Sequence, residues 1–511
     1  MSSKIKKILV ANRGEIAVRV MRACRDMGIT SVAVFSDCDK TAYHVRMADE
    51  AYHIGPPPST ESYLVHDKII DVARRSGADA IHPGYGFLAE NSEFAKRCED
   101  EGIIFIGPKS ETISLLGDKL QARLMALKAD LPVTPGAELT PEDDYDSILG
   151  KATQVGFPIL VKAAAGGGGK GMRVVDSPEM LAESLETAGR EATSAFGDGR
   201  VYLERYLARP RHIEFQILCD QHGNCIHLGE RECSIQRRHQ KVIEESPSPV
   251  MTTQLREKMG TAAVKVARES GYVGAGTVEF LVDEDLSFYF LEVNTRLQVE
   301  HPVTEMVTGL DLVKEQVKIA EGKELIIRQS DVKMTGHAIE CRIYAEDPEE
   351  GFMPSTGILK NYRIPAGPGI RVDSGVVIFS EIPVYYDPII AKLVVWGQDR
   401  AEAISRTQRA LEEYRVSGVK TTIGFHRVVL ANEKFMSGDL STRFLPEQYP
   451  DNSYRVLDHN LSENAAVAVA LDKFIGERKI VVGNGPEHQR NISNWPAFHR
   501  RINLRNFTGS R

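Results

Sequence analysis

The sequence predicts an α/β fold for about the first third of the chain and an α+β fold for the rest. Over residues 7–108, short apolar runs alternate with helical stretches, an order typical of a parallel, doubly wound sheet. From about residue 119, this alternation gives way to pairs of apolar runs separated by glycine-rich or polar turns. A chain of 511 residues should form about three or four domains.

The first region contains successive strand–helix–strand units. Apolar residues recur at every fourth position of the helical stretch 14–28, which favours an amphipathic helix. The expected order is strand 7–12, helix 14–28, strand 31–36, helix 63–77, strand 80–84, helix 94–102 and strand 103–108. Asn12, Gly84 and Gly107 fall at strand ends, where doubly wound sheets bind ligands.

The remaining regions are expected to contain paired strands. The elements before the next boundary are helix 118–129, strand–loop–strand 155–175, and strands 201–207, 212–220, 225–232, 277–283 and 288–294. A polar linker over residues 321–336 marks that boundary, near residue 330. The expected elements after it are strands 337–347, 357–365, 370–376 and 390–397 and a helix 400–415. Beyond about residue 446 the chain is polar and weakly periodic, and only 465–475 favours a short helix.

Composition excludes several classes of protein. With 42% hydrophobic and 26% charged residues, the chain is globular, and a net charge of −8 argues against a general nucleic-acid or membrane-surface binder. There is no apolar run near 18 residues, and the apolar run near residues 7–11 is shorter than a signal peptide needs, so neither a spanning helix nor a signal peptide is expected. The seven cysteines are scattered and form no CxxC pair, which predicts a reduced, cytoplasmic chain with neither a disulfide framework nor a zinc site.

Residues 163–172, AAAGGGGKGM, are the first candidate site. Four successive glycines cannot form a stable helix or strand interior, so they predict a loop whose N–H groups can approach phosphates. This is not a P-loop, because Gly171 rather than Ser or Thr follows Lys170. A plain flexible hairpin is the alternative. Lys162 favours the phosphate site, since a lysine that ends an apolar strand needs an anionic partner.

Two acidic residues of one hairpin form the second candidate site. TVEFLVD and FYFLEVN flank the turn DEDLS, and pairing that is symmetric about Asp285–Leu286 places Glu279 opposite Glu292. Opposed like charges destabilise a sheet unless a cation lies between them. Carboxylate oxygens suit Mg²⁺, which keeps water and substrate phosphates as its other ligands.

The third candidate site continues this second strand. Polar residues follow at every second position, which in an extended segment places them in one row: Glu292, Asn294, Arg296, Gln298 and Glu300. The alternative is an ordinary amphipathic strand with one solvated face. In the functional interpretation, Glu292 and Asn294 lie at the metal. Arg296 and Gln298 supply hydrogen-bond donors to an anion, and Glu300 is a general base.

A basic segment, SIQRRHQKVIEESPSP at 234–249, allows two interpretations. In isolation it is best explained as a solvated charged loop. Beside a site for ATP and an anion, its arginines and lysine would neutralise phosphate charge. Arg342 alternates with apolar neighbours, and Glu340 and Tyr344 share its face and could satisfy it.

In this order and spacing, several segments resemble biotin carboxylase, the ATP-grasp ligase component of biotin-dependent acyl-CoA and pyruvate carboxylases. The matching stretches are KILVANRGEIAVRVMRAC, IHPGYGFLAEN, FIGP, GDK, VKAAAGGGGKGM, ERYLARPRHIEFQ, RECSIQRRHQKVIEE, GTVEF, FLEVNTRLQVEHPVTE, HAIECRIYAEDP and YYDPIIAKL, within about residues 4–446. The resemblance implies a Rossmann-like domain (1–118), an ATP-grasp domain (119–330) with a glycine-rich lid at about 134–205, and a C-terminal biotin-carboxylase-type domain (331–446). The tail 447–511 receives no role.

The resemblance also implies a role for each matching residue. The nucleotide site would comprise Lys119, Lys162, Gly167, Gly168, Gly169, Glu204, Arg205, Leu207, His212, Gln236 and His239. The metal ligands would be Glu279, Glu292 and Asn294, and bicarbonate would bind Lys241, Arg296, Gln298 and Val299. Glu300 would deprotonate bicarbonate, Arg342 would stabilise the biotin enolate, and Tyr85 would line the biotin approach.

The implied reaction uses ATP, two Mg²⁺ or Mn²⁺ ions and biotin borne on a carrier protein. No Ala-Met-Lys-Met acceptor motif occurs, and the nearest string, Val332–Met334, lacks it, so the carrier and the carboxyltransferase are expected as separate chains. A homodimer is expected, with neither nucleic acid nor membrane as a partner. Another ATP-grasp ligase, an NAD-dependent oxidoreductase and a non-catalytic scaffold are the alternatives; the turn ANRGEIA lacks GxGxxG, and the intact acidic residues argue against a scaffold.

Overall fold

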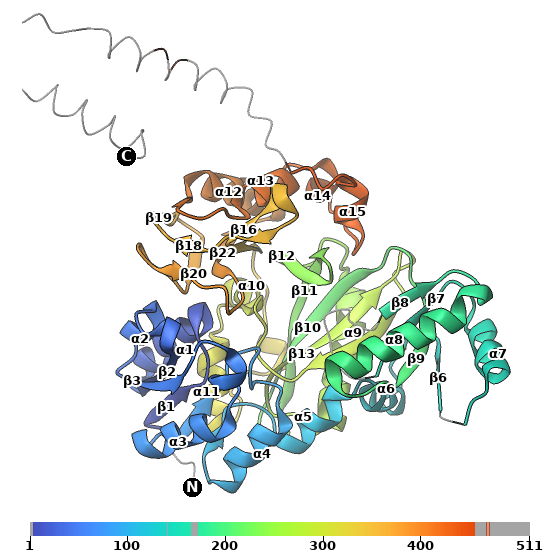
Figure 1. Ribbon diagram of the computed structural model, residues 1–511, viewed down its shortest axis with the longest axis horizontal. Helices are drawn as coiled ribbons and strands as arrows, with labels where there is room; N and C mark the ends of the chain where they lie inside the picture. The colour runs from blue at the N-terminus through green and yellow to red at the C-terminus, as the bar shows by residue number, and fades with distance from the viewer. Residues whose placement is uncertain (1–3, 141, 165–171, 455–466, 468–469, 471–511) are drawn as a thin grey trace, which may run out of the picture. The chain divides into compact units, whose positions relative to one another are not determined.

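In the computed structural model, the N-terminal part contains the predicted parallel sheet, in the order β3-β2-β1-β4-β5. Figure 1 labels its first three strands. The structure describes residues 4–140, 142–164, 172–454, 467 and 470. The elements of this part are β1 (Lys7–Val10), α1 (Gly14–Met27), β2 (Thr30–Ser36), α2 (Tyr43–Met47), β3 (Glu50–Gly55), α3 (His66–Ser76), β4 (Ala80–His82), α4 (Ser92–Asp100) and β5 (Ile104–Phe105). The sequence analysis did not anticipate β3.

A small antiparallel sheet, in the order β6-β9-β7-β8, lies within the predicted lid region. Its elements are β6 (Gly136–Glu138), α7 (Tyr145–Val155), β7 (Ile159–Ala163), β8 (Met172–Val175), α8 (Leu181–Phe196) and β9 (Val201–Arg205). Helix α8 crosses the strands β7, β8 and β9 (Figure 1). Strands β7 and β8 pair directly, which confirms the two predicted strands; the glycines between them, Gly167, Gly168 and Gly169, lie outside the described residues.

A long antiparallel sheet in the order β14-β13-β10-β11-β12-β15-β22-β20 forms the centre of the described chain. Its strands are β10 (Arg211–Cys219), β11 (Cys225–Arg237), β12 (Gln240–Ser246), β13 (Gly274–Val282), β14 (Phe288–Asn294), β15 (His337–Tyr344), β20 (Ile370–Ser374) and β22 (Ile389–Gly397). Strands from both sides of the predicted boundary near residue 330 therefore share one sheet. The domain bounds themselves stay a prediction.

Helices bury the apolar residues of this sheet. One core packs α6 and α9 against β10, β13 and β14, and a second packs α12 and α13 against β15 and β22. The helices are α5 (Ser110–Gly117), α6 (Lys119–Lys128), α9 (Thr253–Glu269), α10 (His301–Thr308), α11 (Leu312–Ala320), α12 (Arg400–Glu413), α13 (Ile423–Leu430), α14 (Glu433–Ser437) and α15 (Phe444–Gln448). The short strands are β16 (Glu346–Asp347), β17 (Met353–Pro354), β18 (Gly357–Ile358), β19 (Asn361–Arg363), β21 (Glu381–Ile382) and β23 (Arg415–Ser417).

Glu279 pairs directly with Glu292 in the β13–β14 hairpin, as predicted, although the pairs nearer the turn, such as Phe280 with Phe290, are shifted by one residue from the predicted register. The predicted extended row from 292 to 300 is wrong beyond Asn294, where β14 ends. Residues 299–300 turn into helix α10, which has Pro302 in its first turn. Proline favours that position because its fixed φ suits a helix start and its missing N–H is not needed there.

The basic segment at 234–249 is not a solvated loop. It continues β11, turns at Arg238 and His239, and returns as β12. Both turn residues have positive φ, 50° and 64°, the backbone of a two-residue hairpin turn whose twist matches that of the strands. Glu244 and Glu245, which follow on β12, are fully buried.

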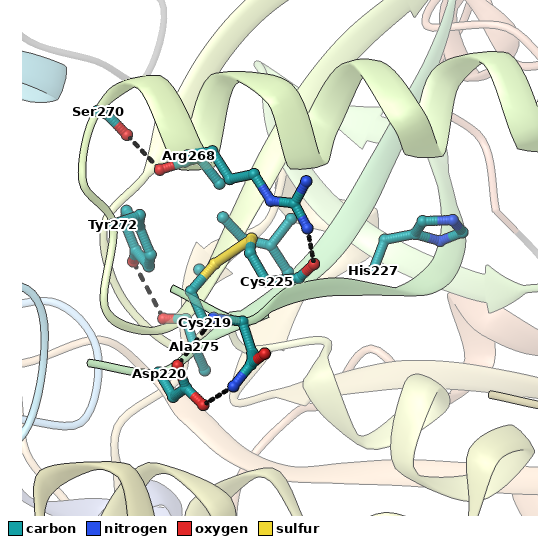
Figure 2. The surroundings of a disulfide bond; sticks show 12 residues. Cys219, Asp220, Cys225, His227, Arg268, Ser270, Tyr272 and Ala275 are labelled. Carbon is teal, nitrogen blue, oxygen red and sulfur yellow. Dashed lines mark hydrogen bonds between the residues drawn. A yellow bond between two sulfur atoms is a disulfide. The ribbon is translucent and has the colours of Figure 1, made fainter. Parts of the chain in front are cut away.

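The cysteine prediction was correct for five residues and wrong for one pair. Cys219 and Cys225 form a disulfide between β10 and β11 (Figure 2). They are direct partners in the strand register, because the hairpin turn brings residues six apart in sequence together. The remaining cysteines, Cys24, Cys38, Cys98, Cys233 and Cys341, are free.

Among the described residues, no helix has both the length and the apolar character needed to cross a membrane. Of the predicted helix at 465–475, only Val467 and Ala470 are described, and both are helical. The rest of that segment lies outside the described residues.

Candidate active site

A pocket of about 660 Å³ is lined by β7 and β9 of the small sheet and by residues of the long sheet and the segment after β14. Most of the predicted site residues line it: Lys119, Lys162, Glu204, Arg205, Leu207, His212, Gln236, His239, Lys241, Glu279, Glu292, Asn294, Arg296, Gln298, Val299, Glu300 and Arg342. The alternating polar residues after β14 thus reach one pocket although the chain there is not a strand.

Tyr85 is not among the lining residues. Its hydroxyl donates to the carboxylate of Glu15, the second residue of α1, and the Lys392 ammonium lies 5.8 Å from the centre of its ring. Lys392 in turn lies 3.2 Å from Glu15 and donates to the Val299 carbonyl at 2.8 Å.

Lys162 forms the cationic end of the pocket on the small sheet. It is buried, and its ammonium donates to the Glu204 carboxylate on the neighbouring strand β9. The anionic partner that the sequence required is thus present within the protein itself. Arg123 from α6 lies 3.3 Å from the same carboxylate, so two cations share one anion here.

Three carboxylates form a row across neighbouring strands, because Glu214 pairs with Glu279 and Glu279 with Glu292. Lys241 donates to Glu214, to Glu279 at 2.8 Å and to Glu300 at 2.7 Å. Burial acts to lower the pKa of Lys241, but these carboxylates raise it well above its ordinary value. The lysine is therefore a fixed positive charge.

Glu279 is also paired with His212, whose Nε2 lies 2.8 Å from its Oε2. Burial alone would raise the pKa of Glu279, yet Lys241 and His212 hold it well below its usual range. Burial opposes the charged form of His212 as well, but Glu279 raises the pKa of that histidine. Glu292 is less buried, with 30% of its side chain exposed, and lies 3.4 Å from Lys119.

Glu300 lies between two cations. Besides Lys241, Arg342 donates to it at 2.9 Å, and the same guanidinium donates to Glu244 at 2.6 Å. Burial acts to raise the pKa of Glu300, but Lys241, Arg342 and Arg231 lower it below its ordinary value. Glu300 is therefore ionised, as a proton acceptor must be. Burial raises the pKa of Glu244 to about 7.

The anion-binding candidates face these carboxylates. The Arg296 guanidinium donates to Glu90 at 2.8 Å and to Asn294 at 3.1 Å. The Gln298 amide donates to Glu279 at 2.7 Å, and so does Asn294 at 2.8 Å. Arg238 and His239 of the hairpin turn line the same pocket.

Two buried carboxylates were missed as site residues by sequence reasoning. Glu214 alternates with His212 on β10, so extending the strand pairing from the β13–β14 hairpin to a third strand would have found it. Glu244 satisfies Arg342, a role that the sequence analysis gave to Glu340 and Tyr344. Glu340 is fully buried, and neither of its carboxyl oxygens has a hydrogen-bond partner within the described residues.

Three family models match the chain in sequence. Residues 4–113 match the biotin carboxylase N-terminal domain, residues 118–328 the carbamoyl-phosphate synthase L chain ATP-binding domain, and residues 340–447 the biotin carboxylase C-terminal domain. The order of the three defines an ATP-grasp ligase of the carboxylase type.

Two relatives of similar sequence agree with this class. A pyruvate carboxylase subunit of Methanothermobacter thermautotrophicus is 56% identical over 441 residues, covering 86% of this chain and 89% of the relative. Biotin carboxylase of a Nostoc species is 54% identical over 444 residues, covering 87% of this chain and 99% of the relative. The chain belongs to the biotin carboxylase family.

The solved structures show the same fold. The biotin carboxylase domain dimer of 2-oxoglutarate carboxylase from Hydrogenobacter thermophilus, a complex with MgADP, ADP and bicarbonate, matches with a TM-score of 0.85 and 48% identity. The match covers 89% of this chain and 100% of that chain. The family assignment establishes the activity of an ATP-dependent ligase that carboxylates biotin, and excludes the oxidoreductase and scaffold alternatives.

Proposed function

We propose that the pocket carries out the first half-reaction of a biotin-dependent carboxylase, with bicarbonate activated by ATP through carboxyphosphate and the carboxyl group passed to biotin. The observation that carries this proposal is the position of Glu300. One pocket holds this ionised carboxylate between two cations at one end and a lysine suited to phosphate at the other.

The nucleotide would bind between the small and long sheets. Lys119 and Lys162 would contact phosphate oxygens, displacing the carboxylates that they now bind. Glu204, Arg205 and Leu207 would follow the adenine, with His212, Gln236 and His239 completing the pocket. Gly167, Gly168 and Gly169 would cover the phosphates and keep water from the labile intermediate.

Glu279 and Glu292 fit a divalent cation, because they are directly opposed and their hard oxygens line the pocket, with the Asn294 amide beside them. These residues would hold two Mg²⁺ or Mn²⁺ ions. A bound ion would supply charge compensation to the phosphates of ATP. Lys241, Lys119 and His212 supply positive charge to the same carboxylates from within the protein.

Bicarbonate would bind near Lys241, Arg296, Gln298 and the backbone of Val299. These donors stabilise a dianion more than a monoanion, so they ease removal of the bicarbonate proton by Glu300. The resulting oxygen attacks the γ-phosphorus of ATP, and ADP leaves. Carboxyphosphate then releases CO₂ and phosphate.

Biotin would approach from the Arg342 side. The phosphate takes the N1 proton of biotin, and the enolate oxygen is stabilised by the Arg342 guanidinium while the nitrogen attacks CO₂. We place Tyr85 along the approach rather than in the pocket wall, since it does not line the pocket.

The carrier of biotin and the carboxyltransferase are proposed as separate chains. The Nostoc relative, matched over 99% of its length, is itself a biotin carboxylase, which supports a separate carboxylase chain. We propose a homodimer in the cytoplasm, and we keep the domain bounds 1–118, 119–330 and 331–446 as part of the proposal.

The experiment replaces Glu300 by Gln and measures ATP turnover with and without biotin and bicarbonate. We expect bicarbonate-dependent turnover to fall by roughly 100-fold or more, the usual share of a positioned base, while ATP still binds. Glu321→Gln, which neutralises a buried carboxyl outside the pocket, is the control. Unchanged turnover in Glu300→Gln would remove the assigned base.

A further inference from the structure

Arg231 lies behind the pocket wall and is the largest fully buried side chain of the described residues. It comes from the middle of β11, has 0% exposure and does not line the pocket. A buried guanidinium is costly unless its charge and its donors are all satisfied.

All five N–H groups of Arg231 have an acceptor. Its Nε donates to Glu214 Oε1; one terminal nitrogen donates to Gln216 Oε1 at 2.7 Å and to the Thr304 hydroxyl at 3.0 Å. The other donates to the Thr277 hydroxyl at 3.1 Å and to Gln298 Oε1 at 2.9 Å. A guanidinium has five donors and no acceptor, so this set uses the group completely.

This arrangement fixes the orientation of the Gln298 amide. Because a guanidinium can only donate, the amide must turn its oxygen toward Arg231 and its nitrogen away from it. That nitrogen donates to Glu279 at 2.7 Å, and Gln298 lines the pocket. One bond to Glu279 uses one of the two amide hydrogens, which leaves the other for an anion.

The same guanidinium orients Glu214. Its Oε1 accepts from Arg231, and its Oε2 accepts from the Lys241 ammonium. Lys241 is in turn held by Glu279 and Glu300. Arg231 thus contacts one anion-binding candidate, Gln298, directly. It reaches a second candidate, Lys241, through the carboxylate of Glu214.

We propose that Arg231 is a positioning residue for the bicarbonate site, which turns the Gln298 amide so that it donates to the anion and sets Lys241 through Glu214. This inference rests on the proposed function, in which Gln298 and Lys241 bind bicarbonate. Lysine could not replace arginine here, because an ammonium has three donors and lacks the planar fork that reaches five acceptors.

The test measures the KM for bicarbonate and the KM for ATP of Arg231→Lys in the full chain. We expect the KM for bicarbonate to rise roughly tenfold or more, the loss expected for one hydrogen bond to a charged group, with the KM for ATP changed less than about twofold. Thr304→Val is the matched control, since it removes an acceptor of Arg231 on helix α10 outside the pocket. An equal rise of both KM values, or the same bicarbonate effect in Thr304→Val, would overturn the proposal.

Gln298→Glu tests the amide orientation without touching Arg231, and it applies even if Arg231→Lys does not fold. One carboxylate oxygen keeps the bond to Arg231 while the donor to the anion is lost, so we expect the KM for bicarbonate to rise roughly tenfold or more. Gln298→Ala distinguishes a failure of the proposed bicarbonate site from a failure of the role of Arg231. If Ala leaves that KM unchanged, the proposed bicarbonate site fails; if Ala raises it and Glu does not, only the role of Arg231 fails.

Discussion

Glu300 and Arg342 share a hydrogen bond, so their effects on the reaction are coupled. The Arg342 guanidinium also holds Glu244, and both carboxylates are buried. Replacing Arg342 by Ala would remove the cation that Glu244 binds and leave Glu300 with Lys241 alone, and removing one partner of a buried ion pair typically costs about 3–5 kcal/mol. It would also raise the pKa of Glu300, so an alanine variant cannot separate the enolate from the base.

Arg342→Lys separates the two roles better. Lysine keeps a positive charge near Glu300 but not the planar pair of donors. We expect bicarbonate-dependent ATP cleavage to remain within about threefold of the wild-type rate, while biotin carboxylation falls by about tenfold or more. Parallel assays of phosphate release and biotin carboxylation measure this, and equal losses would contradict the enolate role.

At the residue scale, the sequence patterns themselves named Lys162, Glu279 and the polar row from Glu292 to Glu300, and the resemblance to the family supplied the other predicted residues of the pocket. Sequence reasoning missed Glu214, Glu244 and Arg231 as site residues. Their partners come from strands or helices far apart in sequence, such as Arg231 with Thr304, and no local pattern shows such a contact.

The β13–β14 hairpin shows what a sequence pattern can predict about the pairing and the ends of a strand. Counting from the turn predicted the opposition of Glu279 and Glu292 correctly, but it did not show the register shift between Glu279 and Phe280 on which that opposition depends. The end of β14 could not be read in the same way, because the polar alternation continues after Asn294 while the chain turns toward α10. The Arg238–His239 turn was missed because neither residue is a usual choice for positive φ.

The hairpin carries a prediction about metal dependence. Glu292→Gln removes one of the two opposed carboxylates, so the Mg²⁺ concentration that gives half the maximal rate should rise by about tenfold or more. Magnesium titration of ATP turnover is the measurement. Glu284→Gln, at the exposed turn of the same hairpin, should leave the midpoint in place. A Glu292→Gln midpoint equal to that of the wild type would undo the metal assignment.

For the whole molecule, the α/β and α+β division of the sequence was correct, since each region follows its own periodicity. The joining of two regions into one eight-stranded sheet was not predictable, because β12 and β15 are about ninety residues apart and each reads only as a strand.

Three of the fully buried histidines, His44, His82 and His426, give the whole fold a pH dependence. Burial lowers the pKa of His44, His82 and His426 to about 4 each. The unfolded chain binds protons near pH 6.5, so it holds more protons than the folded chain between about pH 6.5 and 4, and stability is lost as pH falls through this window. Each of these histidines should lower the free energy of unfolding at pH 5 by about 2 kcal/mol relative to pH 7.

Urea unfolding of wild-type protein and His82→Asn at pH 7 and 5 tests this dependence. The difference between the two proteins isolates one histidine, because the other buried groups titrate alike in both. We expect His82→Asn to lose about 2 kcal/mol less than the wild type on acidification. His53→Asn, at a half-exposed histidine, is the control. A wild-type pH dependence in His82→Asn would show that this histidine is not held neutral.

The pairing of β12 with β15 bears on how the protein is made. During synthesis, β12 leaves the ribosome well before its neighbour, and until residues 337–344 follow, its outer N–H and C=O groups form an open edge that another nascent chain could pair with. Arg342, which contacts Glu300, arrives with β15 itself, and Lys392 of β22, which contacts the Val299 carbonyl, arrives later still. The candidate pocket is therefore completed only after β15 and β22 have been made, and a chain that ends before residue 337 would lack Arg342 and keep the open edge of β12.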